Sequence, residues 1–138
     1  MSSTKRQALR EKALATKPPR SQIVDVAGDK YEVVQPNLHE REEIFRRAGA
    51  LQNIREDGEI DLGKVSPLAL QVWAAIFCTY VPRDQEEERQ GVERERVYEP
   101  DDFALLCAAN PGHPVEKLGP VALSLIGAAS NTEDAKNA

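Results

Sequence analysis

The chain has 138 residues, of which 30% are charged and only 5% aromatic, and its formal net charge is −5. A chain of this length suits one domain with a modest core, which Leu, Ile, Val and Ala must largely fill. No apolar run approaches the roughly 20 residues of a membrane-spanning helix, and the N-terminus lacks the apolar stretch of a secretory signal. We therefore expect neither.

Residues 1–20 differ in charge from the rest of the chain. They carry six basic side chains and one acid, whereas the remaining residues carry twelve basic and twenty-two acidic side chains. Such an acidic body argues against nucleic acid as the main partner, because DNA-binding domains need a cationic face. A short helix is expected at residues 5–16, stopped by Pro18 and Pro19. The pattern predicts a flexible basic arm over residues 1–20.

Residues 23–35 predict a β-hairpin. Two β-rich runs flank Gly28 and Asp29, a pair that favours a tight turn because glycine tolerates positive φ. Val24 and Val26 alternate onto one face of the first strand. Because a lone hairpin is marginal in water, one face of it must pack on helices.

Two amphipathic helices are predicted next. Asn37 and Glu40 have the spacing of a capping box at the start of the first helix, and Ser66-Pro67 is typical of the start of the second. The apolar stripe of the first helix contains Leu38, Ile44, Phe45, Ala48 and Leu51. The stripe of the second contains Ala69, Val72, Trp73, Ile76, Phe77 and Tyr80. We expect the second stripe to form the centre of the core, with a peptide-docking groove along its aromatic residues as the alternative.

The last third of the chain begins with residues 82–96, a charged segment expected to be a solvated loop or an exposed helical extension. A short helix with acids in its first turn follows Pro100, and a longer helix follows Pro114, with a potential kink at Gly119-Pro120. The longer helix has an apolar stripe of Val115, Leu118, Val121, Ala122, Leu125 and Ile126. We predict that this stripe binds a partner, with core packing as the alternative.

These elements together predict a mainly α fold. A small helical domain at residues 21–129, with the β-hairpin packed on it, lies between the basic arm and a polar C-terminal tail at residues 130–138.

Residues with reactive side chains do not form a recognisable catalytic pattern. His39 and Glu43 are one helical turn apart, but a metal site needs three or four ligands. Asp101 and Asp102 are adjacent and begin a helix, where the pKa of a carboxyl is lowered rather than raised towards neutrality. Both cysteines lie among apolar residues, which is typical of buried thiols. We therefore expect no enzyme activity, metal, cofactor or small-molecule substrate.

Three passages follow one another in a suggestive order. The first is VVQPNLHEREEIFRRA at residues 33–48, the second is PLALQVWAAIFCTYV at 67–81, and the third is VYEPDDFALLCAANPGHPVEKLGPVALSLI at 97–126. The chain then ends in the polar EDAKNA. With the hairpin before them, these passages resemble the phage tail assembly chaperones of long-tailed bacteriophages, over roughly residues 23–138. The basic arm lies outside the resemblance.

The resemblance implies a largely helical, non-catalytic chaperone that acts in the host cytoplasm. Its partners would be the long tape measure protein, which it binds before the tail polymerises, and the major tail protein, which it helps to recruit. It would be absent from the mature virion. A structural virion component, such as a head–tail or tail-completion protein, is one alternative. A host regulatory adaptor that places the basic arm on nucleic acid is another.

The resemblance also implies a second, longer form of such proteins, made by ribosomal frameshifting. Ala135-Lys136-Asn137 can be encoded by GCA AAA AAC, which contains the heptamer A AAA AAC. On this heptamer a ribosome can slip back by one base. We therefore expect a frameshifted longer form of the protein as a further partner.

Overall fold

The structure of the protein, a computed structural model, describes residues 2–127. The tail predicted at residues 130–138, with the proposed slip site, lies outside the described residues. Strands β1 (Ser21–Val26) and β2 (Asp29–Val34) form the expected antiparallel hairpin. Val26 pairs with Asp29, so the turn consists of Ala27 and Gly28, with φ of 53° and 89°. The turn predicted at Gly28-Asp29 was therefore wrong by one residue.

The hairpin is part of a larger sheet. Strand β3 (Thr79–Tyr80) follows directly on α3 (Pro67–Cys78) and pairs with β2, which gives a three-stranded antiparallel sheet in the order β1-β2-β3. The predicted helical domain with an N-terminal hairpin is confirmed in outline. A strictly mainly α fold is not, because the third strand comes from the chain after the central helix and makes the hairpin into a sheet.

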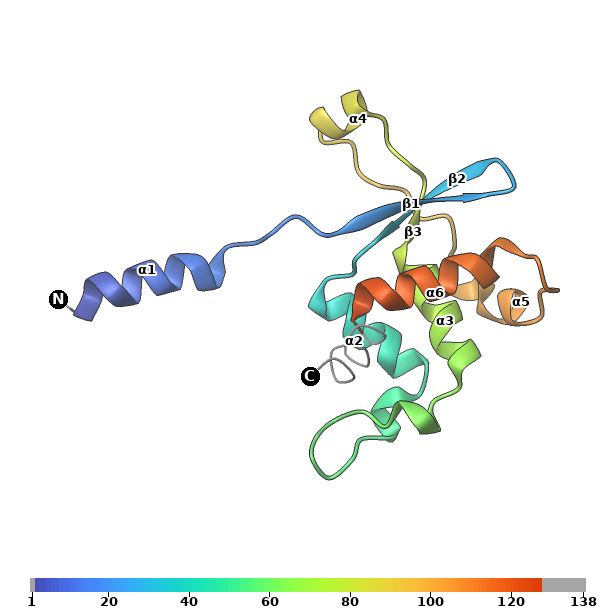
Figure 1. Cartoon of the computed structure of the whole chain (residues 1–138), viewed down its shortest axis with the longest axis horizontal. Coiled ribbons are helices and arrows are strands. Elements are labelled where there is room, and N and C mark those ends of the chain that lie inside the picture. Colours follow the sequence, from blue (N-terminus) through green and yellow to red (C-terminus); the bar gives the residue numbers. More distant parts are fainter. Residues whose placement is uncertain (1, 128–138) are drawn as a thin grey trace, which may run out of the picture.

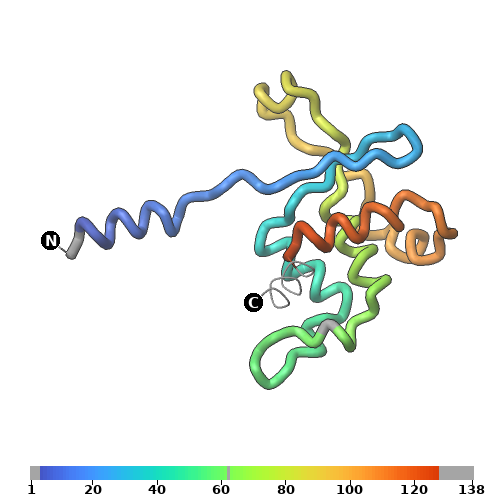
Figure 2. The backbone as a smooth tube through the Cα atoms, in the orientation of Figure 1, coloured from blue at the N-terminus to red at the C-terminus, as the bar shows by residue number. Residues whose placement is uncertain are grey.

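Helix α3 is the centre of the core, as predicted. Helices α2 (Leu38–Arg47), α5 (Phe103–Cys107) and α6 (Pro114–Ile126) contact it, and α6 also contacts the sheet (Figures 1 and 2). Eight residues of α3 are buried: Leu70, Val72, Trp73, Ala74, Ala75, Ile76, Phe77 and Cys78. Helix α6 runs without a break through Pro120, at the position where a kink was considered.

The helix starts agree with the capping patterns of the sequence. The Asn37 side chain accepts a hydrogen bond from the Glu40 backbone amide at 2.8 Å, and the Glu40 carboxylate accepts one from the Asn37 amide at 3.2 Å. At α3, the Ser66 hydroxyl accepts from the Ala69 amide at 3.2 Å. The prediction that Leu38 belongs to the apolar stripe of α2 was wrong. This residue is 81% exposed and does not contribute to the core.

Two elements project from the body. Helix α1 (Ser2–Leu14), predicted at residues 5–16, stands clear of the body at the end of an extended linker (Figure 1). The charged segment contains a short helix, α4 (Gln85–Arg89). This helix is part of a loop that projects from the body (Figure 1) and that is called the excursion (residues 84–95). The two ends of this excursion are held together where the Val81 amide donates to the Glu95 carbonyl at 2.8 Å. Among the described helices, none is both long and apolar enough to cross a bilayer.

Candidate functional site

The predicted partner-binding stripe of α6 lies in the core. Five of its residues are buried: Val115, Leu118, Ala122, Leu125 and Ile126. Val121 is partly buried and packs against the same cluster. The alternative of core packing therefore accounts for the periodicity of this helix. Binding of a partner by the stripe stays a prediction, but the stripe is not an exposed surface in this structure.

Exposed apolar side chains gather instead at a groove where the arm joins the body. This open groove has a volume of about 720 Å³. Three stretches supply most of its lining. These are Thr16, Lys17 and Pro19 of the linker, residues 34–38 from the end of β2 to the start of α2, and residues 91–94 of the excursion. Stretches far apart in the sequence thus meet at one place because the sheet brings β2 beside the chain that leaves α3.

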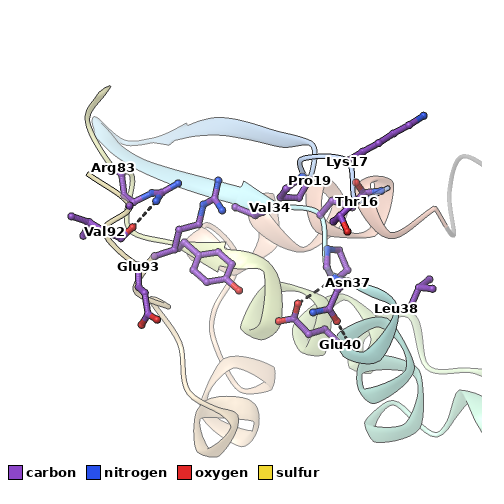
Figure 3. Close-up of a pocket in the computed structure, with 15 residues that line it drawn as sticks. Thr16, Lys17, Pro19, Val34, Asn37, Leu38, Glu40, Arg83, Val92 and Glu93 are labelled. Carbon is purple, nitrogen blue, oxygen red and sulfur yellow. Dashed lines mark hydrogen bonds between the residues drawn. The ribbon is translucent and has the colours of Figure 1, made fainter. Parts of the chain in front are cut away.

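Leu38 and Val92 are the exposed apolar residues of the groove. They lie on opposite sides of it in Figure 3, with Asn37 and Glu40 between them. Leu38 is 81% exposed and Val92 is 40% exposed. Full burial of a leucine or valine side chain is worth about 1.5–3 kcal/mol. A partner that covers both residues therefore gains binding free energy that the fold alone does not use.

Two ion pairs fix the end of the excursion, and the residue that follows it, beside the groove. Nε of Arg94 lies 2.9 Å from Oε1 of Glu32 on β2, and Nη2 of Arg96 lies 2.6 Å from Oε2 of Glu40 on α2. Both pairs join residues more than fifty positions apart in the chain. Because this part of the chain is held in place before any partner arrives, less conformational entropy is lost on binding.

Arg83 adds a polar group to the lining. Its Nη1 donates to the Val92 carbonyl at 2.5 Å, as Figure 3 shows. Its Nε is buried and has no hydrogen-bond partner among the residues that the structure describes. A buried donor without a partner costs about 1–3 kcal/mol. Because Nε has almost no accessible surface, a segment bound in the groove does not reach it, and this cost belongs to the fold itself.

The two aromatic residues of α3, Trp73 and Phe77, do not line a docking groove. Trp73 and Phe77 are buried, and guanidinium groups cover their rings. Arg47 lies 5.0 Å from the centroid of Trp73, and Arg96 lies 5.0 Å from that of Phe77. Such cation–π contacts stabilise the fold and leave no free aromatic surface on these two residues. The prediction that this stripe is core is confirmed for Trp73 and Phe77, whereas Tyr80 lies in β3, is partly exposed and lines the groove.

The cysteines have weakly acidic thiols. Burial, with a smaller contribution from the charge of Glu40, raises the pKa of Cys78 to about 12. Burial also raises the pKa of Cys107, which lines a cavity of about 200 Å³ together with His113. In that cavity, Nδ1 of His113 accepts a hydrogen bond from the Val115 amide at 3.1 Å and so caps the start of α6. Neither thiol is prepared for nucleophilic attack at neutral pH.

Two of the acids considered as metal ligands or catalysts, Glu43 and Asp102, have structural partners. Glu43 binds Arg46 and Arg47 on its own helix, and Asp102 accepts a hydrogen bond from the Glu99 amide at 2.8 Å. Over residues 2–127, no group of three or more His, Cys, Asp or Glu side chains is placed to hold a metal ion.

The groove therefore presents two exposed apolar side chains, Leu38 and Val92, that the fold leaves uncovered. Comparisons of the chain with protein-family models, with curated proteins and with solved structures found no match.

Proposed function

We propose that the protein is a tail assembly chaperone of a long-tailed phage. In this role it binds the tape measure protein and helps to recruit the major tail protein in the host cytoplasm, without entering the virion. The sequence passages at residues 33–48, 67–81 and 97–126 supply the resemblance on which the identity of the partners depends. The observation that carries the proposal is the groove, with exposed Leu38 and Val92 on opposite sides.

The groove suits a helical client for a physical reason. A long helical protein presents apolar side chains at spacings of three and four residues, which dock into grooves of this kind. Covering those side chains before the client assembles prevents them from pairing with other copies of the client. The excess of acidic side chains outside the arm keeps the complex soluble through mutual repulsion.

Co-expression with the tape measure protein of the same phage tests the proposal. The parent protein should move the client from the pellet to the soluble fraction, and Leu38→Asp with Val92→Asp should return it to the pellet. Leu105→Asp is the matched control, because Leu105 is also an exposed leucine but does not line the groove. Equal pelleting of the client with and without the parent protein would contradict the proposal.

Two further measurements separate the alternatives. Mass spectrometry of purified particles should not detect the protein, whereas a head–tail or tail-completion protein would be found at a fixed copy number. A regulatory adaptor would bind nucleic acid with an affinity that falls steeply as salt rises. If the codons for Ala135-Lys136-Asn137 form the slippery heptamer, silent recoding of Lys136 to AAG should abolish a longer product on an immunoblot.

A further inference from the structure

Helix α1 has an exposed face that combines apolar and basic side chains. At 100° per residue, Leu9 and Ala13 lie at the centre of this face. The basic face of α1 is the set Lys5, Arg6, Leu9, Arg10, Lys12 and Ala13. Leu9 is 68% exposed, and Leu14 beside the face is 66% exposed. The face therefore has an apolar centre with cations on both sides.

Nothing within the described chain covers this face, and Lys12 in the last turn is the only charge placed to favour the dipole of α1. Its four cations form no ion pair with any residue from 2 to 127, and its first turn contains no acid to favour the helix dipole. An isolated helix of 13 residues is marginal in water even for favourable sequences. A partner that covers this face with negative charge would therefore stabilise α1 as a helix.

The acidic excursion, residues 84–95, has the complementary character. It carries six carboxylates against the two guanidinium groups of Arg89 and Arg94; the carboxylates are those of Asp84, Glu86, Glu87, Glu88, Glu93 and Glu95. In the described part of the chain, none of the six is in an ion pair. Val92 provides an exposed apolar side chain among them. The excursion projects from the body, as Figure 1 shows, so that a second molecule can reach it.

We propose that the basic face of α1 of one copy docks on the acidic excursion of a second copy. The connection between α1 and the body opposes docking within one molecule, because Pro18 and Pro19 stiffen the linker. In Figure 1 the linker is extended and directs α1 away from the body. Both surfaces are present on every copy, and each lacks a charge partner in its own described chain.

The contact joins two different surfaces, so it is heterologous. Each copy offers its helix to one neighbour and its excursion to another, which yields either a closed ring or an open chain of copies. Because exposed charges make the contact, salt should weaken it. The groove lined by Leu38 is adjacent to the excursion. Self-association therefore also brings the α1 helix of a neighbouring copy close to this groove.

Sedimentation velocity of the full chain, at 50 mM and 500 mM NaCl, measures the association. We expect concentration-dependent oligomers that dissociate at the higher salt concentration. The arm-reversed variant carries Lys5→Glu, Arg6→Glu, Arg10→Glu and Lys12→Glu. The excursion-reversed variant carries Glu86→Lys, Glu88→Lys and Glu93→Lys, and spares the Asp84–Glu87 capping box of α4. Each variant alone should be monomeric, because like charges then face each other.

An equimolar mixture of the two variants makes the test specific. In the mixture, each arm finds an excursion of opposite charge, so that mixed oligomers should form again. A control with Glu42→Lys, Glu56→Lys and Glu59→Lys has the same change in net charge as the excursion-reversed variant and should associate like the parent. Circular dichroism verifies that every variant is folded.

Three results would overturn the proposal. The first is a parent protein that stays monomeric at low salt and high concentration. The second is a mixture of reversed variants that stays monomeric although both are folded. The third is self-association that survives arm reversal, with the reversal abolishing instead the binding of vesicles that contain phosphatidylserine. The partner of α1 would then be an anionic lipid surface.

Discussion

The indole ring of Trp73 lies nearly parallel to the ring of Phe103, with ring centroids 4.4 Å apart and 8° between the two planes. This stack joins the central helix α3 to α5, which follows the acidic excursion in the chain. The contact explains how a five-residue helix keeps its position. Burial of the two rings and their stacking both contribute to stability.

Trp73→Ala should therefore destabilise the fold by about 3–5 kcal/mol, through lost burial and the cavity that remains. Urea unfolding followed by circular dichroism measures this change. Leu105→Ala on α5 is the control, and its cost should lie within about 0.5 kcal/mol because Leu105 is exposed. A Trp73→Ala variant that unfolds at the parent's urea concentration would contradict the position of Trp73 in the core.

Gly119 permits the close approach of α6 to α3. A Cβ atom at this position would lie 3.0 Å from Cβ of Gln71 and 3.2 Å from its carbonyl oxygen. Gly119→Ala should destabilise the protein by about 1–3 kcal/mol through overpacking, although alanine is the better helix former. Ser124→Ala, at an exposed position of the same helix, should change the melting temperature little. Equal melting temperatures of the parent and Gly119→Ala would show that the helices can move apart at no cost.

The ionisation of Glu43 should make the stability of the folded protein depend on pH. Hydrogen bonds from Arg46, and then from Arg47, lower the pKa of Glu43 from 4.5 to about 2. The lowered pKa means that ionised Glu43 stabilises the folded state above about pH 4.5, and that this stabilisation is lost as the pH falls towards 2. The difference in melting temperature between the parent and Glu43→Gln should therefore shrink between pH 5 and pH 2.

A difference between Glu43→Gln and the parent that stays constant from pH 5 to pH 2 would contradict this prediction. It would mean that the two arginines do not stabilise the ionised carboxylate.

Removal of residues 1–20 should leave the fold intact. Every side chain described in this range is exposed, so the truncation removes little buried surface. A chain that begins at Ser21 should keep the helical circular-dichroism signal of its remaining residues and its melting temperature at 500 mM NaCl. A large loss of stability would show that the arm packs on the body after all.

The two thiols should differ in reactivity. Cys78 is buried and its pKa is raised to about 12, whereas Cys107 is partly exposed. At pH 8, iodoacetamide should therefore modify Cys107 slowly and leave Cys78 intact until denaturant is added. Peptide mass spectrometry distinguishes the two sites. Early modification of Cys78 in the native protein would indicate that α3 opens readily.

Local features of the fold could be predicted from the sequence because short-range hydrogen bonds produce them. Asn37 with Glu40, and Ser66 with Pro67, mark helix starts whose caps involve residues three positions apart. The alternation that puts Val24 and Val26 on one face of the hairpin depends on the strand alone, and the structure buries Val24 and partly buries Val26 on that face. The charge contrast between arm and body is likewise a property of composition.

Outside α3, only the tertiary structure decided which apolar residues face the core. Leu118 belongs to a periodic stripe that could equally serve as core or as a docking surface, and it is buried because α3 and the sheet lie against α6. Leu38 fits the stripe of its helix but lies at its first turn, where the body does not cover it. In the sequence, Val92 is only a lone apolar residue in a charged segment. Whether such a residue is buried or exposed depends on contacts between residues far apart in the chain. A local pattern does not specify these contacts.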